Sequence, residues 1–199
     1  MKHSIKLAGI VALVLMVASP AFAQTGGRRT DAAFKFFSSG TYHMKAIMYA
    51  AGMPTTTIET YAKGDNMALI STSQNMSSRM INKGNKTYII MDSEKRVMVM
   101  ALQDNDQPGT DTDNMKFLGS GTADFRGKSL PYEEFTELDS SDDTKVRYFF
   151  DGTKLAGIRS IGSGVTMDME VLALDQNIPG NVFDIPSGYQ VTDMSTFGR

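Results

Sequence analysis

The sequence of 199 residues contains no cysteine, no tryptophan and only two histidines. Without cysteine, the chain cannot form disulfides, use a thiol nucleophile, bind metal through thiolates or carry an acylated cysteine. Its stability must therefore come from an ordinary hydrophobic core. The one histidine outside the N-terminal segment, His43, lies mid-strand beside Lys45. We expect His43 on the surface rather than acting as a base.

Long apolar runs are also scarce, and the main one, Leu7–Ala18, lies near the N-terminus. It follows basic residues and leads into small residues that end at Ala23, which is the order typical of a secretory signal peptide. The run is shorter than the roughly 20 residues that a membrane-spanning helix needs. We therefore expect residues 1–23 to be cleaved after Ala23. The mature protein, residues 24–199, should be periplasmic and not an integral membrane protein.

Neither sign of charge predominates strongly, since 20 basic residues stand against 22 acidic ones. The expected signal peptide contains two of the basic residues and none of the acidic ones, so the mature chain has a net charge of −4. Such a chain is not attracted to nucleic acid or anionic membranes, and we expect no nucleic-acid partner. Its length is that of one domain, which we place over residues 24–199.

Most of the chain consists of segments rich in Thr, Tyr, Val, Ile and Met that alternate with turn residues, a pattern typical of strands and hairpins. The hairpin pattern is strongest at Asp-Gly 151–152. Because the connections are too short for crossover helices, neighbouring strands should be antiparallel. A short helix with the apolar face Ala33, Phe34 and Phe37 should precede them, over about residues 30–39. The predicted strands are 41–50, 55–63, 66–73, 76–82, 86–92, 96–102, 115–125, 129–138, 144–150, 154–162 and 166–174.

Methionine is abundant, with 15 residues, and it recurs at even spacing. Residues two or four positions apart in a strand point to the same face of a sheet. The strands therefore offer one broad apolar face, whereas several positions of opposite parity, among them His43, Lys45 and Arg79, are polar. The residues that we expect to line the apolar face are Met44, Met48, Met67, Leu69, Met76, Met80, Met98, Met100, Met167 and Met169.

Three interpretations of these methionines are open. They can form the core, since apolar periodicity is mainly a folding pattern and methionine fills irregular gaps. They can line a pocket for apolar chains, because flexible and polarizable side chains adapt to ligands of variable shape. The pairs at 98/100 and 167/169 could also offer thioethers to Cu(I). Because neither cysteine nor a second histidine accompanies these pairs, we predict no metal and no cofactor.

Catalytic motifs are not evident in the sequence. The adjacent Glu133 and Glu134 would point to opposite faces of a strand, so we expect a solvated edge rather than a carboxylate pair. The loop 103–114 contains four aspartates, but Pro108 and Met115 occupy positions where a calcium-binding EF-hand needs ligands. We expect this loop to be a solvated acidic segment and the protein to have no enzymatic activity.

Several segments together resemble a known family. They are Lys63-Gly-Asp-Asn-Met67, Asn82-Lys-Gly-Asn-Lys-Thr-Tyr88, the end of the following strand at Asp92–Lys95, Tyr148-Phe-Phe-Asp-Gly-Thr-Lys-Leu155 and Val182-Phe-Asp-Ile-Pro-Ser-Gly-Tyr-Gln-Val191. In their order they resemble the LolA/LolB-type outer-membrane lipoprotein carriers and the exported domains that share their fold. The chain differs from the carriers in lacking tryptophan and in having a polar loop where they place an apolar helical lid.

The resemblance implies a mainly β fold in which about 11 antiparallel strands form a strongly curved sheet, an unclosed half-barrel. A short N-terminal helix would pack on its concave side. The resemblance also implies that the concave side holds lipid or acyl chains. We thus expect non-enzymatic binding of a lipid, an acyl chain or a lipoprotein. The alternative is an envelope protein-interaction or sensing module with a filled core, whose partner would pair with a strand edge.

Overall fold

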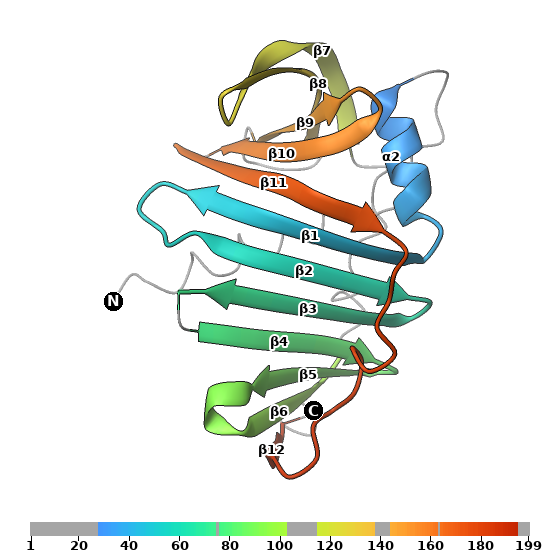
Figure 1. Ribbon diagram of the computed structural model, residues 1–199, viewed down its shortest axis with the longest axis vertical. Coiled ribbons are helices and arrows are strands. Elements are labelled where there is room, and N and C mark those ends of the chain that lie inside the picture. Colours follow the sequence, from blue (N-terminus) through green and yellow to red (C-terminus); the bar gives the residue numbers. More distant parts are fainter. Residues whose placement is uncertain (1–27, 75, 103–114, 138–143, 163, 195–199) are drawn as a thin grey trace. The chain divides into compact units, whose positions relative to one another are not determined.

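The computed structural model describes residues 28–74, 76–102, 115–137, 144–162 and 164–194 (Figure 1). The expected signal peptide and the polar loop 103–114 lie outside these ranges. One α-helix, α2 (Arg29–Phe37), and a short 3-10 helix, η1 (Asp92–Glu94), accompany twelve strands in the described part. The strands are β1 (Thr41–Ala50), β2 (Thr56–Lys63), β3 (Asn66–Ser73), β4 (Met76–Lys83), β5 (Lys86–Met91), β6 (Arg96–Ala101), β7 (Met115–Phe125), β8 (Lys128–Glu137), β9 (Lys145–Asp151), β10 (Lys154–Gly162), β11 (Val165–Asp175) and β12 (Gln190–Asp193).

All eleven predicted strands are present, with ends that differ by at most one residue from the prediction. The twelfth strand, β12, was missed. It is short and pairs with β6 in parallel, whereas consecutive strands pair antiparallel. The hydrogen-bonded order is β12-β6-β5-β4-β3-β2-β1-β11-β10-β9-β8-β7, so within the described ranges the sheet is not closed into a barrel. A mainly β protein with an open sheet and a short N-terminal helix is thus confirmed, and it is consistent with the predicted half-barrel.

The chain divides into two compact units. The first, here called the helix unit, takes its described residues from Met1–Ser39 and Asn105–Asp168. The second, the methionine unit, takes them from Gly40–Asp104 and Met169–Arg199. Among the described helices, none has both the length and the apolar character that crossing a membrane requires. The prediction of one domain over residues 24–199 stays a prediction.

In the helix unit, Glu133 of β8 anchors the start of α2. Its carboxylate accepts hydrogen bonds from the backbone N–H of Arg29 at 2.9 Å and of Thr30 at 3.0 Å, and from Thr30 Oγ1 at 2.5 Å. The first backbone N–H groups of a helix have no partner within the helix, and a carboxylate also interacts favourably with the helix dipole. Glu133 is only 7% exposed. The expectation of a solvated edge was wrong for Glu133, because a carboxylate with these donors can be buried.

Aromatic side chains form much of the core of the helix unit. Phe34 of α2 packs edge-on against Tyr148 of β9, with ring centroids 5.1 Å apart. Phe125 and Phe149 stack at 4.6 Å. The predicted apolar face of the helix is confirmed, because Ala33, Phe34 and Phe37 are all buried. Stacked and edge-to-face aromatic pairs contribute roughly 0.5–1.5 kcal/mol beyond the area that they bury.

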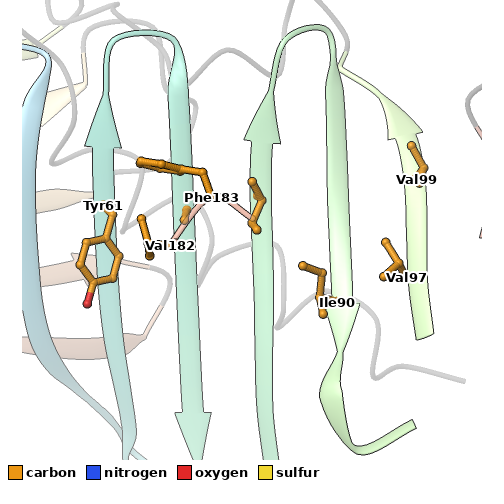
Figure 2. Close-up of a cluster of buried hydrophobic side chains, with 8 residues drawn as sticks. Tyr61, Ile90, Val97, Val99, Val182 and Phe183 are labelled. Atoms are coloured by element: carbon orange, nitrogen blue, oxygen red, sulfur yellow. The ribbon is translucent and has the colours of Figure 1, made fainter. Parts of the chain in front are cut away.

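In the methionine unit, the strands β1 to β6 lie side by side in chain order (Figure 1). The segment after β11 runs across one face of these strands before it becomes β12. On that face, the segment packs Val182 and Phe183 against buried side chains of β2 to β6, among them Ile90 and Val97 (Figure 2). This buried cluster is the main core of the unit, and we call the face on which it lies the sealed face. The complete cluster is Tyr61, Ala68, Ile81, Ile90, Val97, Val99, Val182 and Phe183.

Polar contacts hold the covering segment in place. Tyr189 donates a hydrogen bond to Asp92 Oδ1 at 2.9 Å, and Arg79 of β4 binds the same carboxylate through two nitrogens at 2.9 and 3.0 Å. The backbone N–H of Gln190 then donates to the carbonyl of Lys95 at 2.8 Å, where β12 begins. The hydrogen bond from Arg79 is the main cause that lowers the pKa of Asp92 below its ordinary value of 3.8.

Because this pKa is lower in the folded state than in the unfolded chain, ionised Asp92 stabilises the fold above about pH 4. That stabilisation is lost as the pH falls through the lowered pKa. We expect Asp92→Asn to reduce the melting temperature at pH 7, and we expect the difference from wild type to shrink as the pH falls below about 4. Circular dichroism melts across this range measure it. Asp65→Asn in an exposed turn is the control for removing a carboxylate. A difference that stays constant as the pH falls through the acid range would contradict the assignment.

Candidate functional site

The strand register places the predicted methionines of β1 to β6 on one face. Met44 of β1 pairs with Thr60, Thr60 with Leu69, and Leu69 with Met80. Met80 then pairs with Ile89, and Ile89 with Met98. We call this line of six side chains the central row, and the face that carries it the methionine face. By the same registers, the methionine face also includes Met48, Met67, Met76 and Met100.

Exposure is graded across the methionine face. Most of its residues in β1 and β2 are buried, with Met44 at 1% exposed, Met48 at 3% and Ile58 at 2%. At the corner of the face, Met76 is 74% exposed. The apolar residues between these extremes are half-buried, so they present apolar surface that the described residues cover only in part. These half-buried residues are Met67, Leu69, Met80, Ile89, Met91, Met98 and Met100.

The two remaining predicted residues lie in β11. Met169 belongs to the methionine unit and is fully buried, whereas Met167 belongs to the helix unit and is half-buried. β11 neighbours β1 in the sheet order. Eight of the ten predicted lining residues thus share one face by their register, and the assignment of Met167 and Met169 to that face stays a prediction.

The face opposite the methionine face carries polar residues, as the sequence indicates, but it also carries an apolar core that the sequence did not indicate. That face is the sealed face, and it carries the main apolar core of the unit under Val182 and Phe183. The polar residues Lys45 and Arg79 do lie there, at positions where the side chains reach carboxylates. Sequence parity could not reveal this core, because its apolar residues in β2 to β6 acquire a cover only from a segment about 100 residues further along the chain.

We had expected His43 on the surface. It lies instead in a polar cluster on the sealed face. Its side chain is 14% exposed and stacks on Tyr61 with ring centroids 4.5 Å apart. Its Nδ1 is 3.4 Å from Asp175 Oδ1, and its Nε2 is 3.8 Å from Glu59 Oε2. Glu59 also binds Lys45 Nζ at 2.7 Å.

The contacts of this cluster stabilise its charges. The hydrogen bond from Lys45 is the largest cause that lowers the pKa of Glu59, and a second comes from Tyr61. Burial, followed by the hydrogen bond to Glu59, raises the pKa of Tyr61 to about 12. The phenol is therefore protonated at neutral pH and donates to Glu59 at 2.7 Å. Each of these groups is engaged by a neighbour, which is typical of a structural ion-pair network.

The described residues contain no group of three or more His, Cys, Asp or Glu side chains that could hold a metal ion. The aspartates of the loop 103–114 lie outside the described ranges, so the expectation for that loop stays a prediction. The thioether pair Met98 and Met100 lies on the methionine face together with apolar neighbours in the adjacent strand, such as Ile89. These surroundings suit an apolar ligand.

Among the residues of the methionine face that sequence reasoning missed are Thr60, Ile89 and Met91. All three have the parity of the predicted lining residues once neighbouring strands are paired. The pattern could have found Ile89 and Met91, because extending each hairpin register strand by strand gives their face. The register also gives the face of Thr60, but it does not show that the Thr60 side chain is buried.

Comparison with known proteins shows similarity of structure without similarity of sequence. No protein-family model matches the sequence, and no curated protein matches it significantly. An uncharacterized conserved protein from Thermus thermophilus has a TM-score of 0.52 at 7% identity, over 77% of this chain and 91% of that one. This match shows the fold alone.

Two further structures have lower TM-scores. The lipoprotein LppX from Mycobacterium tuberculosis gives 0.43 at 8% identity, over 71% of this chain and 91% of that one. LprF from Mycobacterium bovis gives 0.41 at 7% identity, over 86% and 95%.

The graded exposure predicts different costs for two substitutions on the same face. Met44→Ala should reduce the free energy of unfolding by about 2–5 kcal/mol, because it leaves a cavity at a fully buried position. Met76→Ala should change it by less than about 0.5 kcal/mol, because the side chain is mostly in solvent. Urea unfolding followed by circular dichroism measures both. Equal effects would show that burial is not graded across the face in solution.

Proposed function

We propose that this chain is an exported, non-enzymatic protein that binds a lipid or an acyl chain on the methionine face. The observation that carries the proposal is the half-buried part of the central row, from Leu69 to Met98. The sealed face already supplies this unit with a core covered by its own chain. Contiguous apolar surface beyond that core is typical of a binding site.

The chemistry of the face suits an acyl chain. Affinity would come from apolar area removed from water, at about 25 cal/mol per Å². Thioether side chains are flexible and polarizable, so they adapt to chains of different length and branching. Specificity for one rigid ligand would instead require several fixed polar groups. This chemistry supports a carrier or chaperone-like role in a LolA/LolB-like protein, and the N-terminal segment supports export to the periplasm.

A second candidate function rests on the edge of the sheet. β7 is the last strand in the sheet order, so within the described residues only β8 pairs with it. A strand with an open edge can add a strand from a partner protein. This feature favours an interaction module, whose methionine face would carry no ligand.

Native mass spectrometry of the protein purified from the exported fraction distinguishes these candidates. We expect a polypeptide that begins at Gln24, together with a near-stoichiometric lipid that organic extraction releases. A mass that retains residues 1–23 would contradict export with cleavage. A ligand-free mass with no uptake of added acyl-chain probe would contradict lipid binding, and it would favour the interaction module.

A charge in the central row should abolish binding. Met80→Asp places a carboxylate where the ligand would bury apolar surface, so we expect the affinity for a fluorescent acyl probe to fall at least about tenfold. Ser77→Asp is the matched control, because Ser77 is exposed in the same strand on the sealed face. It should bind as wild type does. Circular dichroism confirms that both variants are folded, and unchanged binding by folded Met80→Asp would refute the proposed site.

A further inference from the structure

One buried hydroxyl on the methionine face has no hydrogen-bond partner. Thr60 is 2% exposed, and no atom of the described residues donates to or accepts from its Oγ1. The register places Thr60 in the central row, between Met44 and Leu69. Buried hydroxyls are nearly always hydrogen-bonded, because losing water without a replacement is unfavourable. An unpaired hydroxyl among apolar side chains therefore indicates a missing polar partner.

Other buried polar groups on the same face do have partners. Thr87 Oγ1 donates to Asn82 Oδ1 at 2.9 Å, and these two residues also pair in register. Tyr42 is buried as well, and it too has an interaction partner. Thr60 thus differs from its neighbours on the methionine face.

The missing partner must be uncharged. Across the paired positions of β1 to β6, the charged residue on the methionine face is Arg96, which is exposed at the edge and pairs with Glu94 at 3.4 Å. A carboxylate or phosphate beside Thr60 would have no cation to compensate its loss of water. A neutral oxygen, such as that of an ester or an alcohol, can accept a hydrogen bond without this cost.

The central row also indicates the length of the acyl chain that would cover it. Four strand spacings separate Thr60 from Met98, which is about 19 Å along the sheet at roughly 4.8 Å per strand. With carbon–carbon bonds of about 1.52 Å in a zigzag, an extended acyl chain advances about 1.25 Å per carbon. About 16 carbons would therefore cover the row from Thr60 to Met98.

We propose that the ligand is an uncharged long-chain lipid whose ester or hydroxyl oxygen accepts a hydrogen bond from Thr60 Oγ1. Its chain lies along Leu69, Met80, Ile89 and Met98. Because Thr60 Oγ1 is itself buried, neighbouring side chains must move aside for the oxygen to reach it. The chain then covers the half-buried part of the central row. This inference rests on the proposed function and adds the class of ligand and its orientation.

The test compares three probes that share a 16-carbon chain: monohexadecanoylglycerol, hexadecanoate at pH 8 and hexadecane. Displacement of a fluorescent acyl probe gives their affinities. In wild type, we expect the glyceride to bind about tenfold more tightly than hexadecane, which lacks the oxygen, and more tightly than the anion. Among glycerides, the affinity should rise with chain length and level off near 16 carbons. Tighter binding of hexadecanoate, or levelling off at 8 carbons, would overturn the proposal.

Thr60→Val tests the hydroxyl itself, because valine has nearly the same shape. We expect this variant to lose the preference for the glyceride over hexadecane, and to melt at a higher temperature than wild type without ligand. Thr60→Ser should retain the preference and Thr60→Ala should lose it, which provides a second pair if the valine variant does not fold.

The outcomes separate this inference from the proposed function. If the Thr60 variants keep the wild-type preference while Met80→Asp abolishes binding, the role of Thr60 is refuted and lipid binding stands. If Met80→Asp binds all three probes as wild type does, the proposed function itself fails.

Discussion

An unbroken antiparallel register from β1 to β6 is the constraint on which the rest of the methionine unit depends. Neighbouring strands in this unit pair without a register shift, so side chains that are paired across strands lie on the same face of the sheet. A slip by one residue would exchange the two faces of a strand. The register shifts between Phe117 and Gly119 and between Leu155 and Gly157 both belong to the helix unit. The central row can form because no such shift interrupts it.

The two faces of this sheet differ in how their apolar side chains are covered. The sealed face is covered by the protein's own C-terminal segment, which is tied down by Asp92 and by the pairing of β12. β-branched side chains such as Ile90 and Val97 suit this fixed cover, since they are stiff and pack in one arrangement. On the methionine face, unbranched methionines accompany branched residues such as Leu69 and Ile89, and methionine suits a cover whose shape varies. The choice of side chain thus matches the proposed role of each face.

The helix unit shows how a buried charge can serve a structural role. Glu133 gives up its hydration, and the start of α2 supplies three donors in return. Thr60 presents the opposite case, because its hydroxyl is buried among apolar neighbours without a donor or acceptor in the described residues. Two other buried atoms, Asp31 Oδ1 and His43 Nε2, also lack a hydrogen-bond partner, but the other polar atom of each side chain has one. The Thr60 side chain has no such second contact, which makes it the candidate ligand contact.

The sequence by itself determined the secondary structure and most of the candidate site. Alternation within strands and turn residues between them act over two to ten residues, so the eleven strands and the shared parity of residues such as Met98 and Met100 could be predicted. The remaining features were decided by the tertiary structure alone, because they depend on contacts between residues about 100 positions apart in the sequence. These contacts buried Glu133 beneath α2, placed Val182 and Phe183 over the sealed face, and made a strand of β12. The isolation of the Thr60 hydroxyl likewise became visible only when all its neighbours were in place.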